Sequence, residues 1–135
     1  MADNRDRQLT ANFKLSEFKC KNGRDVPPEL LANVQRLADN LQVLRTHLGR
    51  PIVIMSGYRD AEYNRRAGGA AKSRHVTAEA ADIRVPGMTA REVHDAVLLL
   101  IASGVLHNGG VGLYTRLNGW VHYDVRPSAA RWEQE

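Results

Sequence analysis

Apolar residues recur at helical spacing in two long stretches of the chain. Pro27 and Pro28 open the first stretch, and apolar side chains follow at helical spacing over residues 30–48 until Gly49 ends the pattern. Residues 90–103 show similar spacing, and Thr89 and Glu92 form a capping box at the start of this stretch. A third, shorter helix is predicted after Asp60, because aspartate is a preferred N-cap residue.

Short apolar segments between these helices predict four strands. An Asn-Gly turn signal separates the last two, which is typical of neighbouring antiparallel strands. Strands and helices do not alternate regularly enough for a doubly wound parallel sheet. We therefore expect an α+β domain, with a small, mainly antiparallel sheet and helices packed on one face. The predicted strands span residues 51–55, 80–85, 110–114 and 120–125.

The length of 135 residues, 43% of them hydrophobic, fits one compact domain and argues against disorder. The polar start of the chain predicts a flexible arm over residues 1–11, followed by a single domain over 12–135. Phe13, Leu15 and Phe18 form a short apolar segment at the start of that domain. We expect these three side chains to pack onto the body of the protein.

Charge and composition narrow the classes of function. The net charge of +4 favours anionic partners, among them nucleic acid, a membrane surface and an anionic cell-wall polymer. The arginines are scattered and not interleaved with aromatic residues, so a nucleic-acid partner is not expected. No apolar run approaches the ~20 residues of a membrane span, and the polar start predicts no secretory signal peptide. The single cysteine, Cys20, excludes an intramolecular disulfide.

Strand alternation brings a candidate metal site together. In residues 80–85 the apolar side chains share one face and leave Asp82 on the other, while His122 and Asp124 share the polar face of residues 120–125. If the two strands are neighbours, these side chains face one cleft, and His75 in the preceding loop lies near it. Two imidazoles and a carboxylate suit a catalytic zinc. The alternative is a half-buried His122 held by Asp124, with Asp82 capping a turn.

Four ordered segments carry a resemblance to a known family. Residues 73–82 (SRHVTAEAAD) resemble the S-x-H-x-x-G-x-A-x-D signature of the M15 zinc peptidases. These include D-alanyl-D-alanine carboxypeptidases and peptidoglycan endopeptidases of the hedgehog/DD-peptidase fold. The resemblance covers about residues 12 to 132. The other segments are 56–59 (SGYR), 109–114 (GGVGLY) and 121–126 (VHYDVR), and residues 13–20 are similar to the opening of small members.

The resemblance implies a role for each matching position. His75, Asp82 and His122 would bind one Zn²⁺ per chain. Arg59 would bind a carboxylate or carbonyl oxygen of the peptide and stabilise the developing oxyanion. Ser73 would lie beside the metal and hydrogen-bond to the substrate or to a metal ligand.

Two aromatic residues are further candidates for substrate binding. Trp120 shares the phase of His122 on its strand, and Tyr58 lies within the SGYR segment. Each would form a wall for the stem peptide. The alternative for each is a purely packing role in the core.

Two positions depart from the family pattern. Ala78 replaces the signature glycine, a change that is tolerated unless this residue needs a positive φ. Gly119 stands where many members carry an acid as general base. Asp124 is then the best candidate for proton handling, and the alternative for it is to orient His122. Glu79 is a weaker candidate, because the strand phase turns it away from the metal.

We therefore expect a zinc-dependent peptidase that hydrolyses an amide bond in peptidoglycan stem peptides or cross-links, as a carboxypeptidase or an endopeptidase. It would act at the cell wall or in the periplasm after release or delivery, with no stable membrane insertion. The alternative is a catalytically weak or inactive zinc-containing cell-wall-binding module of a phage tail or injection system. This alternative is suggested by Gly119, which stands at the position of the usual acid.

Overall fold

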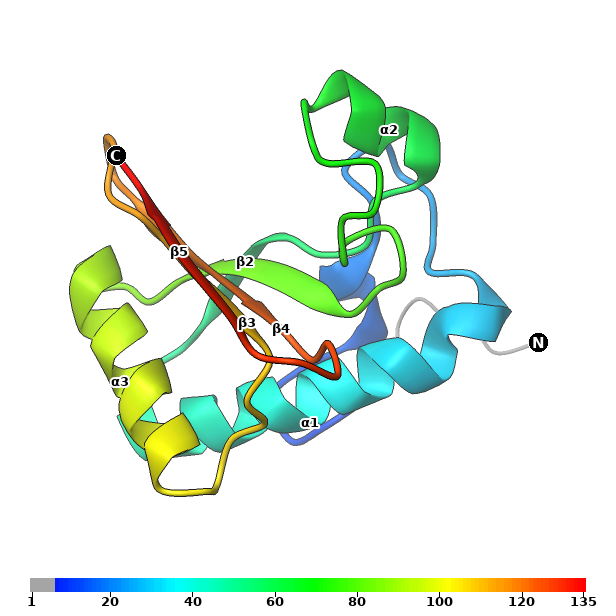
Figure 1. The fold of residues 1–135 in the computed structure, drawn as a ribbon. Coiled ribbons are helices and arrows are strands. Elements are labelled where there is room, and N and C mark those ends of the chain that lie inside the picture. The colour runs from blue at the N-terminus through cyan, green and yellow to red at the C-terminus, as the bar shows by residue number, and fades with distance from the viewer. Residues whose placement is uncertain (1–6) are drawn as a thin grey trace.

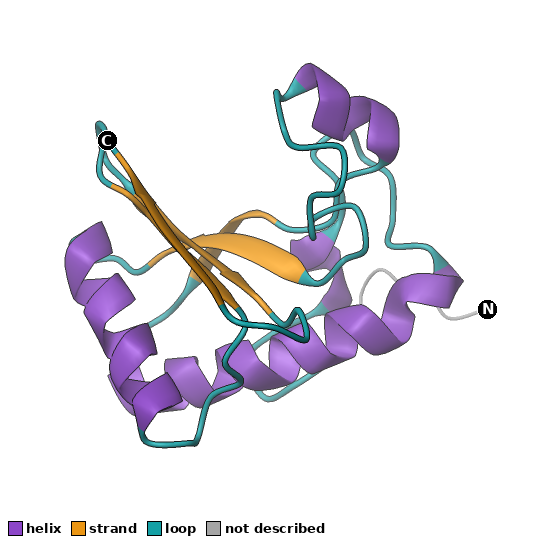
Figure 2. Cartoon of the chain, viewed as in Figure 1, coloured by secondary structure: helices purple, strands orange, loops and turns teal. Residues whose placement is uncertain are grey.

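The computed structural model describes residues 7–135 and contains three α-helices, two 3-10 turns and five strands. Figure 1 shows their arrangement, and Figure 2 shows the strands as one layer beside the helices. The 3-10 turns are η2 (Leu15–Phe18) and η3 (Pro28–Leu30), and the helices are α1 (Leu31–Leu48), α2 (Ala61–Arg66) and α3 (Ala90–Ala102). The strands are β1 (Val53–Ser56), β2 (Ala80–Arg84), β3 (Gly110–Tyr114), β4 (Trp120–Asp124) and β5 (Ala130–Gln134).

The helix boundaries follow the local signals in the sequence. Gly49 ends α1 in the left-handed conformation, with φ of 64°, which costs glycine little. The Thr89 side chain accepts from the Glu92 N–H and the Glu92 carboxylate accepts from the Thr89 N–H, so the predicted capping box begins α3. The Asp60 carboxylate caps α2 by accepting from the Tyr63 N–H.

The sheet has the strand order β1-β2-β4-β3-β5, and every pairing except β3 with β5 is antiparallel. The prediction of an α+β fold with a mainly antiparallel sheet is confirmed. The sequence did not predict β5, because residues 130–134 (ARWEQ) contain no apolar run and form a mostly exposed edge strand. Its pairing with β3 comes from the long-range backbone ladder rather than from its own pattern.

One face of the sheet packs against α1 and α3, which lie on the same side in Figure 1, whereas α2 and the loop after it lie at the other side. The core between them is apolar and includes Leu37, Leu41, Val97, Ile83 and Val121, all at most 1% exposed. This arrangement leaves the opposite face of β2 and β4 free to carry polar side chains. No helix in the described part of the chain is long and apolar enough to cross a membrane.

The amino-terminal segment lies against this core. Phe13, Leu15 and Phe18 are buried, as expected. Of the arm predicted over residues 1–11, residues 1–6 lie outside the described part of the chain. Among the rest, Thr10 donates a hydrogen bond to the side chain of Gln42 on α1. The division at residue 11 stays a prediction.

Candidate active site

The register of β2 and β4 places Asp82 directly opposite His122. Their chain neighbours Ala81 and Val121 point into the core and are fully buried. Because side chains alternate along a strand, Asp82 and His122 therefore point to the other face of the sheet, together with Asp124. The strand phase predicted from the sequence is confirmed.

The loop between α2 and β2 brings His75 to this pair. The Nε2 atom of His75 lies 3.4 Å from Oδ1 of Asp82, and Nδ1 of His122 lies 3.3 Å from the same oxygen. One potential ligand atom from each of the three residues lies within 4.8 Å of the other two, and all three side chains are buried. The structure thus brings together the three residues that the sequence pattern had proposed as ligands.

The outer nitrogen of each imidazole is already occupied. Nδ1 of His75 lies 2.7 Å from the carbonyl oxygen of Gly57, and Nε2 of His122 lies 2.7 Å from Oδ2 of Asp124. A carbonyl and a carboxylate can only accept, so these nitrogens carry the protons. In neutral rings the other two nitrogens then have free lone pairs directed at Asp82. This donor set fits a zinc ion.

Buried charges in the site stabilise one another. Burial raises the pKa of Asp82, but the hydrogen bonds that His122 and His75 donate to it when their rings are protonated outweigh burial and hold this pKa well below its usual range. Burial lowers the pKa of His122, but its hydrogen bonds to Asp124 and Asp82 outweigh burial and raise the pKa above the ordinary value. Asp82 is therefore a carboxylate, the form that binds a cation.

Asp124 has its oxygen atoms fully engaged and is 0% exposed. Oδ1 accepts from the N–H of Gly110 and from both the backbone N–H and Nε of Arg126, while Oδ2 accepts from His122 and from Nη2 of Arg126. Burial raises the pKa of Asp124, but the bonds from His122 and Arg126 outweigh it and hold the pKa well below its usual range. This carboxylate orients His122 and is closed to water.

Arg59 and Ser73 lie beside the three clustered residues. The Arg59 guanidinium donates to the Ser56 hydroxyl at 3.1 Å and to Oδ2 of Asp82 at 3.4 Å, which fixes its position. The Ser73 hydroxyl accepts from the backbone N–H of His75 at 3.2 Å, so it also holds the loop that carries this histidine.

A pocket of about 580 Å³ opens over these side chains. Trp120 lines it, and its ring stacks on Tyr114 with centroids 4.7 Å apart. Tyr58 does not line this pocket: its side chain lies in the hydrophobic core and is 9% exposed. Among the residues that the structure describes, Asp82 is the only carboxylate in the pocket wall.

Trp132 on β5 is a pocket residue that the sequence did not reveal. Its ring lies 4.9 Å from that of His122, and its Nε1 donates to the Tyr114 hydroxyl at 2.7 Å. Gly112 makes room for this ring, because a Cβ at that position would overlap the indole. A glycine inside a strand often marks such a close approach, and this was the available signal.

The two departures from the family pattern have structural explanations. Ala78 has a φ of 59°, so the position does require the left-handed region, and alanine adopts it at a cost. Gly119 also has a φ of 59°, and a Cβ there would lie 2.7 Å from the carbonyl oxygen of Tyr114. The turn before β4 therefore has no room for an acidic side chain at residue 119. Glu79 is held away from the pocket by ion pairs with Arg36 and Arg74.

Comparison with known proteins agrees with this geometry. A family model described as Peptidase M15 matches residues 8–124. The chain is 36% identical over 103 residues to the peptidoglycan L,D-endopeptidase MepK of Escherichia coli K12, and equally to that of Shigella flexneri. The match covers 71% of this chain and 52% of each relative, so the chain spans about half the length of these curated relatives.

Proposed function

This chain belongs to the M15 peptidase family, and on that premise we propose that it hydrolyses an amide bond in peptidoglycan stem peptides or cross-links. We propose that His75, Asp82 and His122 hold a single Zn²⁺ for this reaction. The observation that carries the proposal is the orientation of the two imidazoles, each with its outer nitrogen hydrogen-bonded and its inner nitrogen facing Asp82. The printed name of the MepK relatives supports peptidoglycan as the substrate.

The chemistry divides between the ion and the chain. When bound, a divalent cation supplies a Lewis acid that lowers the pKa of water and polarises the carbonyl to be cut. Asp124 keeps His122 in one tautomer, and the Gly57 carbonyl does the same for His75. Arg59, anchored by Ser56 and Asp82, presents a fixed cation that binds a peptide carbonyl or carboxylate and stabilises negative charge on the reacting oxygen.

Of the two roles considered for Asp124, we propose the orienting one. A general base must reach the water from which it takes a proton, whereas this side chain is fully buried and does not line the pocket. Its place is behind His122, where it strengthens that ligand. Ser73 and Trp120, which do line the pocket, are proposed to contact the peptide.

The proposed place of action is the cell wall, where this substrate lies. The net charge of +4 would favour an anionic polymer over a neutral one. The binding-module alternative keeps one point in its favour, since the pocket wall offers no carboxylate besides Asp82 within the described residues.

The decisive experiment is mass spectrometry of muropeptides after digestion of purified peptidoglycan with the zinc-loaded protein. We expect cleaved stem peptides or cross-links, and we expect chelation or His122→Ala to abolish them. His47→Ala is the matched control, because this exposed histidine lies on α1 outside the pocket. A folded protein that binds one zinc ion but releases no product would leave only the binding-module alternative.

A further inference from the structure

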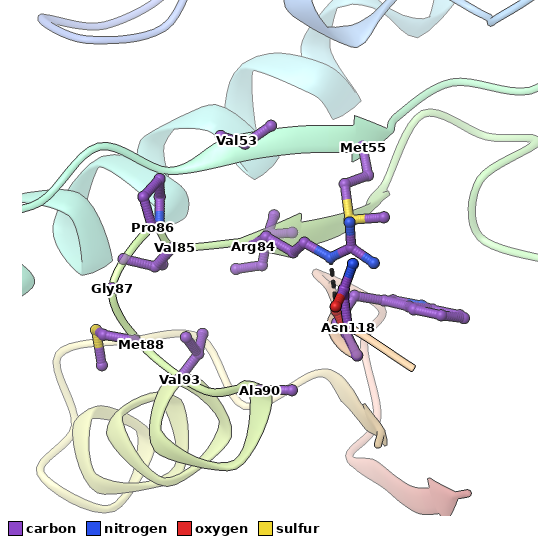
Figure 3. Close-up of a pocket in the computed structure, with 13 residues that line it drawn as sticks. Val53, Met55, Arg84, Val85, Pro86, Gly87, Met88, Ala90, Val93 and Asn118 are labelled. Carbon is purple, nitrogen blue, oxygen red and sulfur yellow. Dashed lines mark hydrogen bonds between the residues drawn. The ribbon is translucent and has the colours of Figure 1, made fainter. Parts of the chain in front are cut away.

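A second pocket, of about 440 Å³, adjoins the candidate active site. We name it the Arg84 pocket, after the one charged side chain in its wall. Its other walls come from β1, from the loop leading to α3 and from the turn before β4. Figure 3 shows the Arg84 side chain running between Met55 and Asn118, with Val53, Met88 and Ala90 along the apolar part of the wall.

Arg84 and Trp120 share one face of the sheet with the candidate active-site residues Asp82 and His122. Arg84 is two residues after Asp82 on β2, and Trp120 is two residues before His122 on β4. Because these strands are antiparallel, both steps run in the same direction, and each covers about 7 Å. Trp120 lines both pockets, so its indole is the wall that they share.

Arg84 differs from the other arginines near the site in its partners. Arg59 pairs with Asp82 and Arg126 pairs with Asp124. Within the described residues Arg84 has no salt bridge, and its Nε donates a hydrogen bond of 2.7 Å to the carbonyl oxygen of Gly119. That bond fixes the orientation of the guanidinium and leaves its two terminal nitrogens for an external acceptor. A half-buried cation beside apolar walls is stabilised by an anion.

We propose that the Arg84 pocket binds a free carboxylate of the substrate peptide, borne about two residues from the bond that is cut. This inference rests on the proposed function and makes Arg84 a specificity-determining residue for it. The two terminal nitrogens of the guanidinium bind the two carboxylate oxygens, and the aliphatic part of the peptide lies against Met55 and Trp120.

The composition of the wall favours an acidic peptide over a phosphate polymer. Binding along a phosphodiester chain uses several cations in a row, whereas Arg84 is the only charged residue among those that line this pocket. The spacing also fits a peptide. An extended chain rises about 3.3 Å per residue, so two residues span the step from His122 to Trp120.

The test compares two stem peptides that differ only in charge, one with free carboxylates and one with those groups amidated. We measure the Kd of each for the zinc-loaded protein, and KM and kcat where cleavage occurs. Arg84→Gln should weaken binding of the free peptide about tenfold and leave the amidated peptide within twofold. Arg84→Lys should retain part of the preference. Arg116→Gln, the matched control, removes the same charge from the exposed turn outside this pocket and should behave as wild type.

If Arg84→Gln weakened binding of both peptides equally, the proposal would be overturned. That result would mean that Arg84 only supports the turn before β4, through its hydrogen bond to Gly119. Equal binding of both peptides to the wild type would overturn it as well. Failure of the proposed function is a separate outcome. If the wild type binds the free peptide more tightly than the amidated one but cuts neither, carboxylate binding by the Arg84 pocket is supported and the proposed peptidase activity is not.

Discussion

The Nε2 atom of His122 donates a 2.7 Å hydrogen bond to Oδ2 of the buried Asp124, and the opposite nitrogen of the same ring faces Asp82. This relationship orients the ring of His122, which we propose as a metal ligand. It also places Asp124, the residue that the sequence suggested for proton handling, behind that ring.

Asp124→Asn tests that assignment. The amide no longer provides the charged acceptor for His122 and Arg126, so we expect zinc affinity to fall by about 10- to 100-fold. Competition with a chromophoric chelator measures it. Asp39→Asn, an exposed carboxylate on α1, is the matched control and should leave the affinity unchanged. Unchanged zinc affinity with lost turnover would instead favour proton handling by Asp124.

Zinc should stabilise the folded protein, because the three proposed ligands come from β2, β4 and the loop before β2, which only the fold brings together. At a free zinc concentration about 100 times the Kd, the free energy of unfolding should rise by about 2.7 kcal/mol. Urea unfolding with and without zinc measures the increase. His122→Ala should lose it and His47→Ala should retain it. An equal increase in both variants would mean that zinc binds elsewhere.

Adding a side chain at residue 119 should destabilise the folded protein. Gly49→Ala, at a φ of 64° with no atom near the added Cβ, should cost about 1–2 kcal/mol for the left-handed conformation alone. Gly119→Ala adds an overlap with the Tyr114 carbonyl and should cost a further ~1–3 kcal/mol. Equilibrium unfolding of the two variants gives the difference directly. Equal costs would show that the turn relaxes, and that an acid is accommodated at residue 119.

Acid should weaken the cap of α2. Hydrogen bonds from the Tyr63 N–H and the Asn22 amide hold the pKa of Asp60 below its ordinary value. A depressed pKa means that the carboxylate stabilises the fold at neutral pH, and that this contribution is lost as the pH falls below about 4 towards the lower pKa of the folded state.

Asp60→Asn keeps a capping oxygen but does not titrate. We therefore expect its unfolding free energy to fall less than that of the wild type between about pH 6 and about pH 3. Urea unfolding at both pH values measures this difference, and Asp39→Asn serves as the control for loss of one exposed charge. Parallel decreases in the wild type and Asp60→Asn would show that this cap does not contribute to acid sensitivity.

The amino-acid sequence was sufficient to predict the elements whose signals are local. Helical spacing and caps placed α1, α2 and α3, and strand alternation put Asp82 and His122 on the same polar face. Periodicity carries this information because a residue's phase depends on its near neighbours along the chain. His75 lies in a loop without periodicity, so its place near this face followed only from its closeness to Asp82 in the chain and from the family resemblance.

Features that depend on contacts between distant segments became visible only in the folded chain. Only the parallel pairing of β5 with β3 brings Trp132 over His122, and Tyr58 lies in the core, where its backbone N–H donates to the carbonyl of Phe18. The same kind of long-range arrangement gives Arg84 the Gly119 carbonyl as its partner and, among the described residues, no salt bridge. Such partnerships arise when strands join a sheet, so no local pattern encodes them. The same holds for the full burial of Asp124, on which its proposed orienting role rests.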